Sequence, residues 1–307
     1  MSRIAYVNGQ YVRHAQAAVH VEDRGYQFAD AVYEVWGVID GELTDFEGHL
    51  KRLARSLKEL QIRKPLSDAA LTAILQRIVA VNRIRYGLIY LQISRGVARR
   101  DHVFPPDSVP PSIVITARSA NANAAESRAQ RGIAVITRPD QRWARRDIKT
   151  VSLLPNALAK QAARAEGAAE CWMIDRDGMI TEGAAANAWI ITADGVLVTR
   201  AADHDILNGI TRRIIFELAE KQGLATEERP FSRDEALRAR EAFITSATSF
   251  LTPVVRIDSQ PVGNGHPGSF SLMLRERYVA TAKDRSKAPA MRQPVWLVAR
   301  RSKHLQN

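Results

Sequence analysis

Apolar and polar residues alternate at the start of the chain, and this period of two predicts β-strands. Residues 4–7 and 11–12 carry the alternation on either side of Asn8-Gly9, a pair typical of a tight hairpin turn. Residues 32–38 are rich in valine, tyrosine and tryptophan, which favour strands. The chain is therefore expected to open with a hairpin and a further strand.

Two amphipathic helices are expected next, because apolar residues recur every three or four positions. The repeats span residues 46–60, with Asp45 near the start, and residues 67–79. Both helices are expected to cover a sheet. Arg52 lies one residue off the apolar stripe of the first helix, so the helix alone predicts a solvent-facing charge there.

The rest of the chain alternates short apolar runs, typical of strands, with two helical stretches. A helix is expected from Pro155 to about Glu166, since proline is favoured in a first helical turn and Gly167 ends the pattern. Another is expected from Asn208 to Gly223. Strands are expected at 88–94, 112–117, 133–137, 171–174, 188–192, 196–199 and 241–244.

Residues 119–127 are rich in alanine and asparagine, show no apolar period and predict an interdomain linker. They would separate an N-terminal α/β domain, residues 1–118, from a C-terminal domain, residues 128–284. A basic tail, residues 285–307, follows. The sequence thus predicts two domains and a tail.

The composition, 46% hydrophobic and 25% charged, is that of a globular protein, but the net charge of +11 raises nucleic-acid binding as a function. After Asp284 six positive residues and no acidic one occur, which leaves about +5 for the preceding chain. The sequence shows no zinc-finger spacing, basic zipper helix or aromatic RNA-binding strand. A solvated basic tail is favoured, and a basic nucleic-acid-binding protein is kept as the alternative from another class.

Cys171 is the only cysteine, which excludes an intrachain disulfide and a multi-cysteine metal site. It lies in the apolar run 171–174, so a buried core residue is expected rather than a nucleophile. The first residues lack the apolar core of a signal peptide, and no run approaches the roughly 18 apolar residues of a membrane span. A cytoplasmic protein without membrane contact is expected.

Lys149 is the main candidate for chemistry, because it directly precedes a predicted helix and lies near Arg145 and Arg146. Burial and neighbouring cations lower the pKa of a lysine amine and make it a nucleophile. A solvated surface charge is the alternative. Two clusters of small and hydroxyl residues, 209–211 and 245–249, offer donors to a phosphate, although the first is equally compatible with an ordinary helix cap.

Arg52, Lys149, the stretch 181–189 between two strands and these two clusters follow one another in an order that resembles the fold type IV family of pyridoxal-phosphate enzymes. That family includes branched-chain aminotransferases, D-amino acid aminotransferases and aminodeoxychorismate lyases. The similarity covers residues 6 to about 282. It implies an α+β, two-domain fold in which each domain is a β-sheet or barrel-like sheet packed with helices, with the cofactor in the C-terminal domain.

The resemblance implies pyridoxal 5'-phosphate as the cofactor. Lys149 would bind it covalently and move the proton between the substrate's α carbon and C4′, and Glu182 would pair with the pyridine nitrogen. The phosphate group would be held by Arg52, by Ile210 and Thr211, and by Ala247 and Thr248.

A basic loop makes the chain most similar to the D-amino acid aminotransferases of that family. Arg100-Asp101-His102 after Ser94-Arg95-Gly96 matches their Arg-x-His loop. Tyr33, Arg100 and His102 would bind the substrate carboxylate, with the loop reaching the site of a second subunit in a homodimer. The implied reaction transfers the amine of a D-amino acid such as D-alanine to a 2-oxo acid such as 2-oxoglutarate, in two half-reactions.

Departures from the family pattern keep other activities open. Ala184, Ala185 and Ala186 stand where the family usually has serine or threonine, and Trp36 could narrow the side-chain pocket, although packing is favoured for it and for Trp172 and Trp189. A branched-chain L-amino acid aminotransferase, an amine transaminase and a 4-amino-4-deoxychorismate lyase remain alternatives, as does a regulatory protein that binds the cofactor without turnover.

Overall fold

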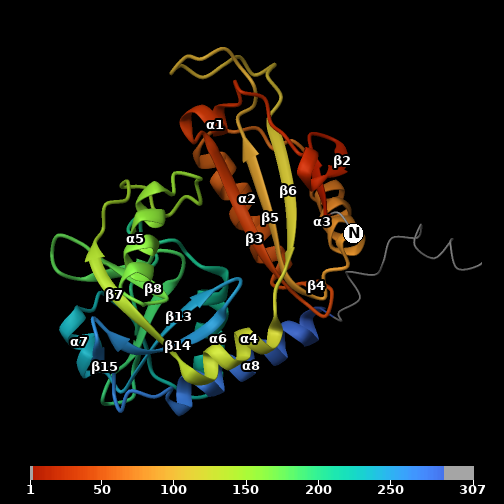
Figure 1. Ribbon diagram of the computed structural model, residues 1–307. Coiled ribbons are helices and arrows are strands. Elements are labelled where there is room, and N and C mark those ends of the chain that lie inside the picture. The colour runs from red at the N-terminus through yellow and green to blue at the C-terminus, as the bar shows by residue number, and fades with distance from the viewer. Residues whose placement is uncertain (1–2, 287–307) are drawn as a thin grey trace, which may run out of the picture.

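The computed structural model of the protein describes residues 3–286, which form two β-sheets with helices packed on them (Figure 1). The first sheet has six strands in the order β2-β1-β6-β5-β3-β4, and the second has nine. The strands of the first are β1 (Ile4–Val7), β2 (Gln10–Arg13), β3 (Ala31–Ile39), β4 (Glu42–Leu43), β5 (Tyr86–Ser94) and β6 (Ser112–Ser119). Two sheets with packed helices agree with the predicted α+β class.

The amino-terminal hairpin forms as predicted. Asn8 and Gly9 have φ angles of 44° and 95°, both in the left-handed region that a two-residue hairpin turn requires. β1 and β2 pair antiparallel from this turn, with Ile4 opposite Arg13. A 3-10 turn (His14–Gln16) and the short helix α1 (Arg24–Phe28) then lead into β3.

The two predicted helices, α2 (Phe46–Glu59) and α3 (Asp68–Asn82), pack on the six-stranded sheet. Leu53 and Leu75 are buried in that core together with Trp36, whose side chain is 0% exposed. Trp172 and Trp189 are also fully buried, so the expectation that the three tryptophans pack in the core is confirmed.

The stretch expected to be a linker contains the helix α4 (Ala122–Arg131). Asn121 caps its start, accepting a hydrogen bond from Ala124 N at 3.1 Å. Its only buried residue is Ala129, which explains why no apolar period is visible although alanine favours helices. The helix does lie between the two sheets in the chain, and the domain boundary there stays a prediction.

The second sheet curves into a barrel-like shape. Its strand order is β12-β11-β10-β13-β14-β7-β8-β9, with β15 paired to β14, yet only residues 184–186 connect β9 to β10. The sheet must therefore bend to bring these two strands together. Its strands are β7 (Ile133–Pro139), β8 (Glu170–Ile174), β9 (Ile180–Gly183), β10 (Asn187–Ile191), β11 (Leu197–Thr199), β12 (Thr226–Glu228), β13 (Glu241–Ser246), β14 (Phe250–Ile257) and β15 (Gln260–Pro261).

The predicted helices of this half are present as α5 (Leu154–Ala165) and α6 (Ile210–Lys221), and α7 (Arg233–Arg238) and α8 (Ser269–Ser286) follow. Strand β9 was not predicted: Glu182 lies within it, between β8 and β10. Cys171 is free and buried, as predicted, and burial raises the pKa of its thiol to about 11.

Helix α8 joins the two halves of the molecule. It runs beside α4 in Figure 1, and Arg275 Nη2 meets Glu126 Oε2 at 3.2 Å. The buried hydroxyl of Tyr278 donates a hydrogen bond to Asp45 at the start of α2. Most of the basic tail, including the apolar residues 295–298, lies outside the described residues. Among residues 3–286 no helix is long and apolar enough to cross a membrane.

Candidate active site

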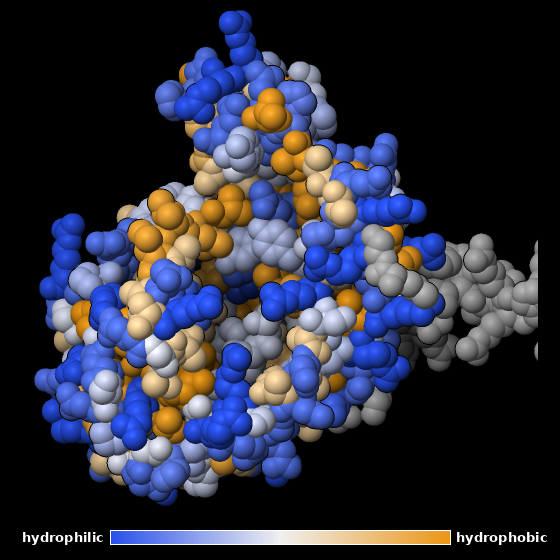
Figure 2. Space-filling model, in the orientation of Figure 1, coloured by the Kyte–Doolittle hydropathy of each residue, from blue (hydrophilic) through white to orange (hydrophobic). Residues whose placement is uncertain are grey.

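A cavity of about 230 Å³ lies between the two halves and opens as a hollow on the face shown in Figure 2. Both sheets and the helices on them contribute to its wall. Eight of the predicted site residues line it: Tyr33, Arg52, Lys149, Glu182, Ile210, Thr211, Ala247 and Thr248. The sequence therefore predicted much of one cavity from stretches up to about 200 residues apart in the chain.

Lys149 is held at this cavity by backbone pairing with β3. Its carbonyl accepts a hydrogen bond from Tyr33 N at 3.0 Å, and Thr150 forms an isolated bridge with Val32. The lysine amine lies 4.2 Å from the centre of the Tyr33 ring, and the residue is half-buried. These backbone contacts at Lys149 and at the next residue give the amine a defined position in the cavity wall.

The arginines near Lys149 are occupied by carboxylates. Arg145 donates to Asp147 at 2.9 Å and to Glu59 at 2.7 Å, while Arg146 donates to Asp205 at 2.6 Å. The cations next to the lysine in sequence are therefore compensated by ion pairs.

Asp147 gives a pH-dependent contribution to stability that can be measured. Although its burial opposes the shift, Arg145 and Arg55 lower the pKa of this carboxyl to about 2. The stabilisation is present above the unfolded pKa of about 4 and is lost as the pH falls from there towards 2. Asp147→Asn is expected to lower the free energy of unfolding at pH 7 by about 1–2 kcal/mol, and by less at pH 3. Urea unfolding at both pH values checks this, and an equal loss at both would contradict it.

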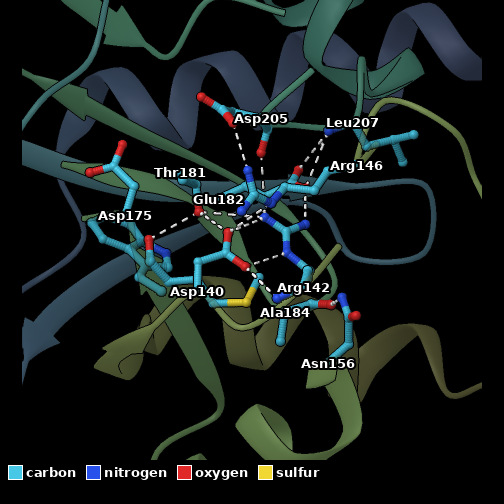
Figure 3. A network of polar contacts seen from close by, with 12 residues as sticks. Asp140, Arg142, Arg146, Asn156, Asp175, Thr181, Glu182, Ala184, Asp205 and Leu207 are labelled. Atoms are coloured by element: carbon cyan, nitrogen blue, oxygen red, sulfur yellow. Dashed lines mark hydrogen bonds and ion pairs between the residues drawn. The ribbon is translucent and has the colours of Figure 1, made fainter. Parts of the chain in front are cut away.

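Glu182 is a buried carboxylate at the inner end of the cavity (Figure 3). It accepts hydrogen bonds from Arg142 Nη1, from Asn187 Nδ2 at 2.9 Å and from Leu207 N at 3.2 Å. Burial raises the pKa of Glu182, and the contacts with Arg142 and Leu207 oppose that shift. The arrangement presents a fixed acceptor to a nitrogen placed in the cavity.

The helix pattern alone predicted that Arg52 faces solvent, and this is wrong: its side chain is only 9% exposed. Its Nε and Nη2 meet the two oxygens of Glu34, each at 2.8 Å. His49 Nδ1 also lies 2.8 Å from Glu34 Oε2. Although burial opposes it, Arg52 and His49 lower the pKa of Glu34 well below its ordinary value. This triad fixes a guanidinium in the cavity wall.

The first turn of α6 and the turn after β13 complete an anion-binding wall. Ile210 and Thr211 lie at the helix start, where backbone N–H groups have no partner within the helix. Ala247 and Thr248 face the same cavity. Gly209 permits a close approach, since a Cβ there would lie 2.1 Å from Asn187 Oδ1. A cation, a helix start and a hydroxyl suit a phosphate, and with Lys149 and Glu182 they fit pyridoxal phosphate.

Gly209→Ala is expected to damage this wall through Asn187. The added methyl group must displace the Asn187 side chain, which supports Glu182 and donates to Leu207 O at 2.9 Å. We expect the free energy of unfolding to fall by about 1–3 kcal/mol and cofactor affinity to fall with it. Denaturation and cofactor titration check this. Gly178→Ala is the comparison: a Cβ there meets nothing within 4 Å, but the φ of 79° strains any side chain, so this variant should lose stability while keeping cofactor affinity, because Gly178 does not line the cavity.

Arg100 and His102 do not line the cavity of their own chain. Both are exposed on the loop that projects from the top of the molecule in Figure 1. Phe28 lies between them: its ring centre is 4.7 Å from the Arg100 guanidinium carbon and 5.5 Å from the His102 ring. Arg24, which is buried, donates to Asp101 O at 2.6 Å and so fixes the loop from below.

Several residues at the site were not predicted, namely Glu34, His49, Arg142 and Asn187. His49 precedes Arg52 by three residues and so shares its helix face, a signal present in the sequence. Arg142 offers no local signal, because Glu182 is 40 residues away. The three alanines 184–186 line the cavity, and Asn156 Nδ2 donates to Ala184 O at 2.8 Å, so a backbone group is engaged there.

Comparison with known proteins identifies relatives along most of the chain. Residues 31–257 match the model of the family described as amino-transferase class IV. A D-alanine aminotransferase from Bacillus licheniformis is 40% identical over 261 residues, covering 85% of this chain and 90% of that protein. One from Listeria monocytogenes serotype 4b (strain F2365) is 41% identical over 274 residues, covering 89% and 94%.

Solved structures share the fold. The branched-chain amino acid aminotransferase of Escherichia coli superposes with a TM-score of 0.85 at 24% identity, covering 94% of this chain and 97% of that one. The T.th. branched-chain amino acid aminotransferase with pyridoxamine 5'-phosphate gives a TM-score of 0.84 at 25% identity, covering 94% and 96%. The resemblance to fold type IV enzymes is thereby confirmed.

Proposed function

The chain belongs to the class IV aminotransferase family, and from this premise we propose that it transfers the amine of D-amino acids such as D-alanine to a 2-oxo acid such as 2-oxoglutarate. It is a pyridoxal-phosphate-dependent aminotransferase. The observation that carries the proposal is one cavity in which Lys149, Glu182 and an anion-binding wall meet. The D configuration is supported by relatives of 40% and 41% identity.

A proton must leave the α carbon when the amino acid gives its amine, and a proton must be delivered to the α carbon when the 2-oxo acid receives the amine. We assign both transfers to the amine of Lys149, which would hold the cofactor when no substrate is bound. The bound cofactor supplies an electron-accepting ring that stabilises the electron pair left when the α C–H bond breaks. Glu182 keeps the proton on the ring nitrogen, because a buried carboxylate stabilises the protonated form of a basic group beside it.

Binding of the cofactor phosphate is assigned to the wall formed by α2, the start of α6 and the turn after β13. Arg52 supplies a fixed positive charge, and Ile210 and Thr211 supply N–H groups at the positive end of α6. Ala247 and Thr248 close the site from the β13 side. These groups position the cofactor but take no part in proton transfer.

The substrate carboxylate is assigned to Tyr33, Arg100 and His102. Only Tyr33 lines the cavity of this chain, so we assign the loop to the site of a second subunit in a homodimer. The outer face of the six-stranded sheet supports such a partner, because Tyr33, Val35 and Tyr90 lie half-exposed beside the cavity, and Tyr33 stacks on Tyr90 at 5.6 Å. The cytoplasm remains the expected compartment.

A substrate panel tests this function. Purified enzyme with cofactor and 2-oxoglutarate is expected to form glutamate from D-alanine and from other D-amino acids, with L-leucine and L-isoleucine inactive. The branched-chain activity is kept as the alternative, since the two solved structures of the same fold named above are enzymes of that kind. Activity confined to the L-amino acids would overturn the proposal, and cofactor absorbance without turnover on any donor would indicate a regulatory protein.

Phe28→Ala is expected to impair substrate binding specifically. Losing the ring frees both Arg100 and His102, so the KM for D-alanine should rise about 10-fold, while cofactor affinity stays unchanged because Phe28 is outside the cavity wall. Steady-state kinetics with a cofactor titration separate the two effects. Phe28→Tyr keeps an aromatic face and should behave as wild type, and an unchanged KM in Phe28→Ala would contradict the assigned role of the loop.

A further inference from the structure

Glu182 belongs to a chain of alternating carboxylates and guanidiniums (Figure 3), in which Arg142 and Arg146 also line the cavity. Arg142 comes first, since its Nη1 donates to Glu182 Oε1. Asp140 binds the other edge of that guanidinium, with Nε to Oδ1 at 3.0 Å and Nη2 to Oδ2 at 2.7 Å. The further members are Arg146, Asp205, Arg200 and Asp175.

Arg142 has almost no freedom to move. Its side chain is 8% exposed, and that of Asp140 is 0% exposed. Asp140 is fixed in turn, because it accepts hydrogen bonds from Arg142 N at 3.0 Å and from Thr181 Oγ1 at 2.8 Å. Thr181 is the residue before Glu182 in β9, so the arginine and the carboxylate it contacts are anchored to the same strand.

The contacts of Glu182 leave one acceptor direction for a ligand. An ionised carboxylate has about four lone-pair sites. Arg142, Asn187 and Leu207 supply three donors, and Glu182 faces the cavity with the remainder. Of the three donors only Arg142 carries a charge, so it is the charged group that compensates the buried negative charge by direct contact, while Lys149 acts on Glu182 only through space.

We propose that Arg142, held by Asp140, is a positioning residue that keeps the Glu182 carboxylate ionised and aimed at the cofactor's ring nitrogen. The proposal rests on the role given to Glu182 above. Arg142 contacts neither substrate nor the reacting atoms in this scheme, and it acts through Glu182 alone. Its contribution is preorganisation: a carboxylate already fixed before binding loses less freedom when the cofactor arrives.

A double-mutant cycle on cofactor affinity tests this. Arg142→Gln is expected to weaken pyridoxal-phosphate binding by about 10- to 100-fold in the wild-type background, and by less than about 2-fold in the Glu182→Gln background. Arg142→Lys keeps the charge but cannot contact Glu182 and Asp140 with the two edges of a guanidinium, so its cofactor affinity is expected to lie between those of wild type and Arg142→Gln. The dissociation constant is measured by titrating the purified apoprotein with the cofactor.

Arg95→Gln serves as the matched control. The Arg95 side chain is 10% exposed, and its Nε and Nη2 contact both oxygens of Asp30 as those of Arg142 contact Asp140, but Arg95 does not line the cavity. Its cofactor affinity should equal that of wild type. If Arg142→Gln lowered cofactor affinity equally in both backgrounds, or did not lower it at all, the proposal for Arg142 would be overturned while the assignment of Glu182 would stand. Unchanged affinity in Glu182→Gln would overturn the assignment of Glu182, and that of Arg142 with it.

Discussion

Lys149→Ala is expected to lower kcat for transamination by about 10⁴-fold, because it removes both the covalent attachment of the cofactor and the proton carrier at the α carbon. The fold should remain intact, since the lysine is held by backbone contacts that alanine retains. Borohydride reduction followed by mass spectrometry should then find the cofactor on wild-type Lys149 and nowhere on the variant.

The exposed Lys51 provides the control, and Lys51→Ala should keep full activity. Added methylamine should restore part of the activity of Lys149→Ala, because a small free amine can enter the space left by the side chain. Retained turnover in Lys149→Ala, or cofactor attached to another lysine, would show that the site has been assigned wrongly.

Arg52→Gln is expected to have the largest effect on stability. Glu34, which is 0% exposed, would lose its bidentate partner and remain as a buried charge beside His49, at a cost of about 3–5 kcal/mol. Cofactor affinity should fall about 10- to 100-fold as well, since a charged donor to the phosphate is lost. Thermal unfolding and cofactor titration measure the two effects separately.

The pH dependence of the stability of Arg52→Gln tests whether the unpaired Glu34 carboxylate causes the loss. In wild type the pKa of Glu34 is lowered, so the pair stabilises the fold above the unfolded pKa of about 4.3 and this stabilisation is lost on acidification. In Arg52→Gln burial should raise the pKa of Glu34, and the variant should gain stability as the pH falls from 7 towards 5. Glu34→Gln/Arg52→Gln removes the charge and should recover part of the loss at pH 7. A variant less stable at pH 5 than at pH 7 would contradict this account.

The sequence predicted those parts of the structure that depend on neighbouring residues. The hairpin at Asn8-Gly9 and the helices α2 and α3 follow from turn chemistry and a local apolar period. Helix α4 was not predicted because it buries only Ala129 and so leaves no periodic mark. Burial alone is not sufficient, however, since β14 (Phe250–Ile257) was not predicted although it is almost wholly buried.

The site was predicted only as far as the resemblance reached. The helix pattern alone predicts a surface charge at Arg52, and only the family resemblance assigns it to a site. Its environment depends on Glu34, which lies 18 residues away on another element. Arg142 was not predicted because its role depends on Glu182, which lies 40 residues away on β9, and the nearby Asp140 alone indicates only a local ion pair. Arg100 and His102 lie outside the cavity of their own chain, and the second subunit proposed for them cannot be placed from a single sequence.

The contact between Tyr278 and Asp45 has a consequence for biosynthesis. Asp45 emerges from the ribosome early, but its partner lies in α8, the last described helix of the chain. The wall of the cavity includes residues up to Thr248, and α8 packs against the helix and strands that carry several of them. A nascent chain can therefore fold its first sheet before α8 is made, yet it acquires a complete cofactor pocket only after α8 has been synthesised.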